Sequence, residues 1–205
     1  MSDNIRVGLI GYGYASKTFH APLIAGTPGM ALAAVSSSDA AKVHADWPSV
    51  PVVFEPKHLF NDPNIDLIVI PTPNDTHFPL AKAALEAGKH VVVDKPFTVT
   101  LSQARELDAL AKSLGRLLSV FHNRRWDSDF LGIKQIIEQD TLGKIKHLES
   151  HIDRFRPEVR VRWREQNVSG SGLWFDLGPH LIDQTLQLFG LPQSVQGNIA
   201  TLRDA

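Results

Sequence analysis

Short, mostly apolar runs alternate with helical patterns through the first 121 residues. Strands buried on both faces of a parallel sheet show such runs, because neither face carries polar residues. The predicted strands are residues 5–10, 32–35, 52–54, 67–70, 90–93 and 117–121. The predicted helices are residues 15–25, 40–46, 76–87 and 101–114. This alternation predicts an α/β fold with a doubly wound parallel sheet, the Rossmann architecture, over residues 1–121.

The pattern changes in residues 122–205, where we expect a second, α+β domain. Apolar positions at helical spacing predict a helix over 128–139 and another over 177–189. Apolar and polar residues alternate over 144–154, which predicts a strand with one face in solvent, and 194–202 has a similar strand pattern. The second domain is therefore expected to contain a mostly antiparallel sheet.

Charge and composition exclude several classes of function. The formal net charge of −1 over 205 residues gives no electrostatic reason to expect nucleic acid or an anionic membrane as a partner. Cysteine is absent, which excludes disulfides, thiolate metal ligands and a thiol nucleophile. No apolar stretch reaches the length of a membrane span, the N-terminus does not resemble a signal peptide, and no histidine spacing predicts a metal site. We therefore expect a cytoplasmic protein without a metal.

A glycine-rich turn follows the first predicted strand and opens the first predicted helix. Gly11, Tyr12, Gly13 and Tyr14 form this turn, in which the first glycine permits a tight bend and the second lets a pyrophosphate approach the backbone. The N–H groups of the following helix favour the same anion. Ser16 replaces the usual third glycine. The turn predicts dinucleotide binding, and the alternative is an ordinary strand-to-helix turn.

The end of the second predicted strand bears on the choice between NAD and NADP. An NAD site usually has an acidic residue there that binds the ribose 2′-hydroxyl, but Ser36 and Ser37 occupy the position. Serine does not repel a 2′-phosphate, and Lys42 could add positive charge. The nearby Asp39 supports NAD instead. The sequence favours NADP slightly over NAD.

Two further motifs follow strands that should end at the same edge of the sheet, where doubly wound folds bind ligands. Thr72, Pro73, Asn74 and His77 could contact the cofactor, or could form a proline turn that caps the next helix.

The second motif is Asp94-Lys95-Pro96. Lys95 and Pro96 are expected beside cofactor and substrate, with the lysine polarising a substrate oxygen. A cis peptide bond before Pro96 would aim the lysine inward. The alternative is a lysine exposed on the surface.

An acid–imidazole–acid stripe marks the predicted helix near the end of the chain. Asp176, His180 and Asp183 share one face at about 100° per residue. A histidine on a rigid element, oriented by a carboxylate, suits proton transfer. A helix cap at Asp176 and a surface His180 are the alternative.

Arginines in the second domain leave their roles open. Asn123 and Arg125 could border a substrate pocket, or the segment could pair with Asp127 and Asp129. Five more arginines could form an anion clamp or a solvated or subunit-facing loop: Arg154, Arg156, Arg160, Arg162 and Arg164.

Together the motifs resemble the glucose–fructose oxidoreductase, inositol dehydrogenase and rhizopine catabolism (Gfo/Idh/MocA) family across essentially the whole chain. The resemblance implies that Lys95, Asp176 and His180 line the site facing the nicotinamide. Asp94 departs from the glutamate usual in the family, and Ser16 departs from its usual glycine or alanine.

The resemblance implies an NAD(P)-dependent dehydrogenase that transfers a hydride between the nicotinamide and a secondary alcohol of a sugar or polyol. His180 would be the acid/base, Lys95 would stabilise the alkoxide, and Asp176 would orient the pair or bind a hydroxyl. Two alternatives remain: a nucleotide-binding sensor or scaffold without turnover, and a variant that uses bound NAD to cleave a glycosidic bond or eliminate a group.

Family members typically extend well beyond this length, whereas this sequence stops at Ala205, near the end of a predicted strand. It resembles a truncated form with an incomplete second sheet. Such a sheet leaves an edge and an apolar face uncovered, so we expect either a homo-oligomer formed through it or impaired stability and catalysis.

Overall fold

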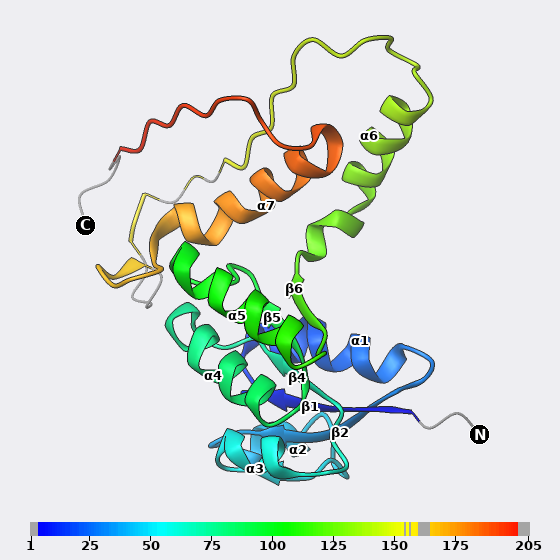
Figure 1. Cartoon of the computed structure of the whole chain (residues 1–205), viewed down its shortest axis with the longest axis vertical. Coiled ribbons are helices and arrows are strands. Elements are labelled where there is room, and N and C mark those ends of the chain that lie inside the picture. The colour runs from blue at the N-terminus through cyan, green and yellow to red at the C-terminus, as the bar shows by residue number, and fades with distance from the viewer. Residues whose placement is uncertain (1–3, 154, 156, 160–164, 201–205) are drawn as a thin grey trace. The chain divides into compact units, whose positions relative to one another are not determined.

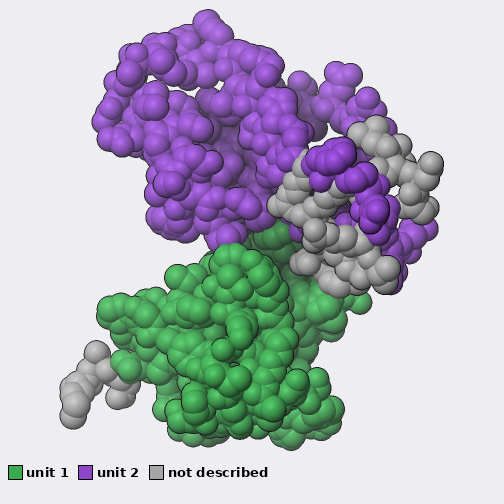
Figure 2. Space-filling model, turned by 180° about the vertical axis from the view of Figure 1, so that it is seen from behind, with its two compact units in different colours: residues 1–121 green, residues 122–205 purple. Residues whose placement is uncertain are grey.

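The computed structural model describes residues 4–153, 155, 157–159 and 165–200. The chain divides into two compact units, residues 1–121 and 122–205, shown in different colours in Figure 2. The five arginines between 154 and 164 lie outside the described residues.

The first unit is built on a six-stranded sheet in the order β3-β2-β1-β4-β5-β6, with all neighbouring strands parallel. This is the Rossmann order, so the predicted fold class is confirmed. From β1 the chain adds β2 and β3 on one side of the sheet, and then β4, β5 and β6 on the other side. Such folds bind ligands where this order changes, between β1 and β4. The strands are β1 (Ile5–Ile10), β2 (Met30–Ser36), β3 (Val52–Val53), β4 (Leu67–Ile70), β5 (His90–Asp94) and β6 (Leu118–Phe121).

Helices cover both faces of this sheet, which explains why its strands are mostly apolar (Figure 1). Ile68 and Ile70 of β4 pack in one apolar cluster with residues of α3, α4 and α5, while Val69 packs in another with residues of α1 and α2. The helices are α1 (Ala21–Gly26), α2 (Ala40–His44), α3 (Pro56–Asn61), α4 (Asn74–Glu86) and α5 (Leu101–Ser113).

Two features of these helices differ from the sequence prediction. The predicted helix over 15–25 is formed by a π-helical turn, η1 (Ser16–His20), followed by α1. The short α3 was not predicted, because six residues carry too little periodicity to identify a helix.

The described residues of the second unit contain η2 (Asn123–Trp126), α6 (Ser128–Glu138) and α7 (Gly172–Phe189). The sequence predicts the last helix over 177–189, whereas α7 begins five residues earlier, at Gly172, and contains Pro179 in its interior. No helix in the described part of the chain is both long and apolar enough to cross a membrane.

The strands predicted over 144–154 and 194–202 are not formed. Residues 145–153 and 191–200 are irregular in the structure, while Arg154 and residues 201–202 lie outside the described part. A strand requires a hydrogen-bonded neighbour, and an alternating sequence does not by itself provide one.

Candidate functional site

The glycine-rich turn leaves the backbone bare at the end of β1. Gly11 has a φ of +79°, a conformation that glycine adopts without strain, and its N–H donates to the Ser36 carbonyl at 2.7 Å. A Cβ added at Gly13 would meet no atom within 4 Å. The space beside Gly13 is therefore open, as a backbone cradle for a phosphate requires.

The two tyrosines of the turn have different environments. Tyr12 is buried, and its hydroxyl donates to Asp46 Oδ2 at 2.9 Å. Burial and the bond to Asp46 raise the pKa of Tyr12. The Lys17 ammonium lies 2.8 Å from the same carboxylate. Tyr14 is 77% exposed, so its ring is accessible to a ligand, whereas the Tyr12 side chain anchors the turn.

A cavity of about 410 Å³ lies between this turn and the end of β2. Ser36 and Ser37 line it, but the Ser36 hydroxyl donates to the Phe54 carbonyl at 3.2 Å, and the Ser37 hydroxyl accepts from the Asp39 N–H at 3.1 Å. The Asp39 carboxylate caps α2 by accepting from the Lys42 N–H at 3.0 Å. The exposed Lys42 side chain also lines the cavity and places a positive charge there.

The turn after β4 is held by its own hydroxyl groups. The Thr76 hydroxyl donates to the Pro73 carbonyl at 2.6 Å, so the Thr72 hydroxyl donates in the 2.6 Å contact between the two threonines. Pro73 is exposed, while Asn74 at the start of α4 is 4% exposed.

His77 joins the ends of β4 and β5. Its ring is fully buried, with Nδ1 2.8 Å from the Pro96 carbonyl and Nε2 2.9 Å from the Thr72 carbonyl. The sequence left open whether His77 contacts the cofactor or belongs to a proline turn. Both ring nitrogens face backbone oxygens and the ring has no accessible surface, which suits a positioning role between the two strand ends.

Lys95 follows β5 directly and is partly buried. Its backbone N–H donates to Asp94 Oδ1 at 2.7 Å. The Lys95–Pro96 peptide bond is cis, as expected. Lys95 thus stands at the carboxyl edge of the same sheet that carries the glycine-rich turn.

The acid–imidazole–acid stripe is turned inward in the second unit. His180 and Asp183 are 6% and 8% exposed, and Asp176 is partly buried. Arg125 donates to Asp183 twice, from Nε at 2.8 Å and from Nη2 at 2.6 Å. These hydrogen bonds raise the pKa of Arg125. The Arg125 guanidinium, expected at the substrate, is therefore engaged by α7, and Asn123 lies beside it in η2, partly exposed.

Sequence reasoning missed this ion pair and its surroundings. His122 Nε2 lies 3.9 Å from Asp183 Oδ1, and Gln184 donates to the Arg124 carbonyl at 3.0 Å. Arg125 and Asp183 are 58 positions apart, so no local pattern identifies them as partners.

Substituting Arg125 should lower the free energy of unfolding more than substituting Asp183. Arg125→Ala leaves the buried Asp183 carboxylate without its two donors, and we expect a loss of about 2 kcal/mol in unfolding free energy. Asp183→Asn leaves a guanidinium whose side chain is 40% exposed and can be hydrated, so we expect about 1 kcal/mol. Urea unfolding at neutral pH measures both. Equal losses would contradict the asymmetry.

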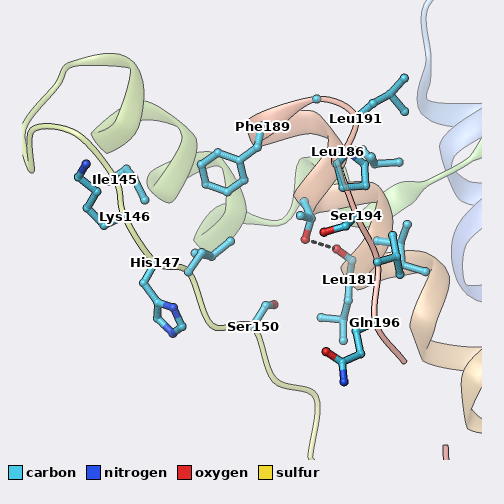
Figure 3. A pocket seen from close by; sticks show the side chains of 16 residues that line it. Ile145, Lys146, His147, Ser150, Leu181, Leu186, Phe189, Leu191, Ser194 and Gln196 are labelled. Atoms are coloured by element: carbon cyan, nitrogen blue, oxygen red, sulfur yellow. Dashed lines mark hydrogen bonds between the residues drawn. The ribbon is translucent and has the colours of Figure 1, made fainter. Parts of the chain in front are cut away.

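The opposite face of α7 lines an apolar cavity of about 700 Å³ (Figure 3). Leu181, Leu186 and Phe189 of α7 contribute to it, with the irregular segments 145–150 and 190–196. His180 and Asp183 do not line this cavity, so the helix separates an apolar face from its acid–base stripe. In the described residues no three histidine, aspartate or glutamate side chains gather as metal ligands.

Comparison with known protein families identifies the family of this chain. Residues 5–122 match the oxidoreductase family with an NAD-binding Rossmann fold, and residues 130–205 match the GFO/IDH/MocA C-terminal domain. The chain belongs to the Gfo/Idh/MocA oxidoreductase family. The predicted family is thereby confirmed, and its Rossmann unit is an NAD(P)-binding domain.

Relatives within the Gfo/Idh/MocA family are close over nearly the whole chain. The oxidoreductase YdgJ of Escherichia coli is 78% identical over 203 residues, which cover 99% of this chain and 59% of YdgJ. The scyllo-inositol 2-dehydrogenase (NADP(+)) IolW of Bacillus subtilis is 42% identical, covering 98% of this chain and 56% of IolW. The chain thus spans between half and two thirds of the length of these relatives.

A solved family structure agrees with the fold. An oxidoreductase structure from Yersinia pestis is 69% identical and superposes with a TM-score of 0.93, covering 100% of this chain and 58% of its own. The fold of this chain is therefore also found in a longer protein.

Proposed function

We propose that the protein is an NAD(P)-dependent dehydrogenase that oxidises a secondary alcohol of a sugar or polyol reversibly. The observation that carries this proposal is the open backbone at Gly13, on the sheet edge that also bears Lys95. The name of the IolW relative, a cyclic polyol dehydrogenase, supports the substrate class. We place this activity in the cytoplasm, in a homo-oligomer.

Different residues of this chain would carry out proton transfer, charge stabilisation and substrate orientation. His180 would take the proton from the substrate hydroxyl, and the Lys95 ammonium would stabilise the negative charge that develops on that oxygen. Asp176 would orient these groups or bind a neighbouring hydroxyl. A bound nicotinamide would accept the hydride from the carbinol carbon. Gly11, Gly13 and Tyr14 would hold the cofactor at the end of β1.

NADP is the proposed cofactor, because the Lys42 side chain lines the cavity and would pair with a 2′-phosphate. Asp39 lines the same cavity, and its Oδ1 accepts the Lys42 N–H as the cap of α2. IolW, the scyllo-inositol 2-dehydrogenase (NADP(+)) of Bacillus subtilis, is named for the same cofactor.

Substituting Lys42 tests the cofactor preference. Lys42→Ala should weaken NADP binding about tenfold, or about 1.4 kcal/mol, since an ionic contact to the 2′-phosphate is lost. NAD affinity, measured by calorimetry on the same variant, is the internal control and should not change. A wild-type preference for NAD, or equal losses for both cofactors, would refute the assignment.

A screen of sugars and polyols, followed by the absorbance of reduced nicotinamide, tests the reaction. Release of reduced cofactor into solution supports a dehydrogenase. Cofactor binding without turnover of any substrate would favour a sensor or scaffold. Net cleavage of a glycoside with NAD retained would favour the variant that uses its cofactor transiently.

A further inference from the structure

A buried histidine outside the proposed catalytic set faces the residue that precedes Lys95. His20, the last residue of η1, is 4% exposed, and its Nε2 lies 3.6 Å from Asp94 Oδ2. Its ring packs on Phe121, with 4.3 Å between ring centroids. Asp94 and Phe121 are paired neighbours at the ends of β5 and β6, so His20 lies over the carboxyl edge of the sheet.

The local backbone around His20 is unusual. The Ala21 N–H donates to the Ser16 carbonyl, five residues back, which makes this turn π-helical. Pro22 has no N–H with which to continue an α-helical pattern through the turn. Isolated π-turns concentrate at functional sites, because the extra residue redirects the side chains around it. In this turn the redirected side chain is that of His20, whose buried imidazole lies beside the Asp94 carboxylate.

Asp94 uses its two oxygens differently. Oδ1 accepts the Lys95 N–H at 2.7 Å, and Oδ2 faces His20. Burial raises the pKa of Asp94, but the His20 imidazole and Lys95 lower it more, so the pKa lies below its usual value. At 3.6 Å the contact with His20 is electrostatic rather than a well-formed hydrogen bond. Asp94 is therefore an ionised link between the imidazole and the lysine backbone.

We propose that His20 is a positioning residue that holds the Asp94 carboxylate, and through it the Lys95 backbone, in place at the sheet edge. The last residue of β5, Asp94, and the following Lys95 belong to this cluster, and β6 contributes the uncharged Phe121 ring. Lys17, on the same turn as His20, is bound to Asp46 instead. The kinetic consequence of this role rests on the proposed function of Lys95, whereas the link to Asp94 does not.

Carboxyl titration tests the link without any turnover. Aspartate labelled with ¹³C gives the Asp94 resonance, which is assigned by its loss in Asp94→Asn, and the Lys95 amide shift follows the same ionisation. The pKa of Asp94 should lie below that of an ordinary aspartate in the wild type. It should rise in His20→Phe, which keeps a ring but removes the polar nitrogens. It should take an intermediate value in His20→Gln, which keeps a side-chain N–H donor but lacks the imidazole ring.

The control is His58→Phe, a substitution of an exposed histidine on α3. It should leave the Asp94 titration as in the wild type. The same Asp94 pKa in wild type, His20→Phe and His20→Gln would overturn the proposal. If His20→Phe does not fold, the comparison of His20→Gln with wild type decides the question by the same criterion.

Kinetics then separate positioning from structure. In protein with measurable turnover, His20→Phe should lower kcat about tenfold with little change in cofactor affinity, and His20→Gln should recover part of the loss. An unchanged kcat would refute the effect on Lys95. If the wild type shows no dehydrogenase turnover, the proposed function fails, and the titration still tests the His20–Asp94 link.

Discussion

Lys95→Ala and His180→Ala are each expected to lower turnover by about 10²–10⁴-fold while cofactor affinity stays nearly unchanged. The expected size follows from their proposed roles. A positioned general acid/base and a group that stabilises a developing oxyanion each contribute about this much to a rate. Stopped-flow or steady-state assays give kcat, and calorimetry gives the dissociation constant of NADP. Asp176→Asn should be similarly harmful if the carboxylate orients the pair.

Matched controls make this test specific. Lys82→Ala removes a partly exposed lysine of α4 that pairs with Glu106 of α5. His58→Ala removes an exposed histidine of α3. Both should retain wild-type turnover. Since Lys95 and His180 act on one substrate oxygen in the proposal, the double variant should be little worse than the worse single variant. Full turnover in either single variant would remove that residue from the mechanism.

Comparing this chain with a version extended to the full length of its relatives shows whether turnover requires the additional residues. The chain covers 59% of YdgJ, and turnover confined to the longer protein would leave the residue assignments intact. The effects of Lys95→Ala and His180→Ala on turnover would then be measured in the longer protein. Cofactor binding would be measured in this chain and in the longer protein.

Gly13→Val should weaken NADP and NAD binding by about 100-fold or more without loss of the fold. The added Cβ meets no protein atom, so the substitution is not expected to strain the folded chain. The branched side chain would instead fill the space that a pyrophosphate needs against the backbone. Calorimetric titration measures the affinity, and thermal unfolding without cofactor measures the stability.

Two other glycines provide the comparison for this variant. A Cβ at Gly26 also meets nothing within 4 Å, so Gly26→Val should keep both fold and cofactor affinity. A Cβ at Gly8 would lie 2.9 Å from Ile68 Cδ1, in a fully buried cluster, so Gly8→Val should destabilise the fold. Unchanged cofactor affinity in Gly13→Val would show that the turn does not hold a dinucleotide.

The sequence by itself was sufficient for the Rossmann sheet. β1 and β4 were predicted with their observed bounds, because strands covered on both faces are apolar over most of their length and end sharply at turn residues. The glycine-rich turn and the Lys95 motif were also identified from local patterns. Such features depend on neighbouring residues in the chain, so their signals are present in the sequence.

The tertiary structure decided which polar side chains meet. His20 and Asp94 are 74 positions apart, and Arg125 and Asp183 are 58 apart, so only the folded chain brings each pair together. It also showed that the two ring nitrogens of His77 face backbone carbonyls, and that the alternating segments at 145–153 and 194–200 form no strands. Periodicity reports which face of an element is apolar. It contains no information about the distant group that satisfies a buried charge, or about the neighbouring strand that a sheet requires.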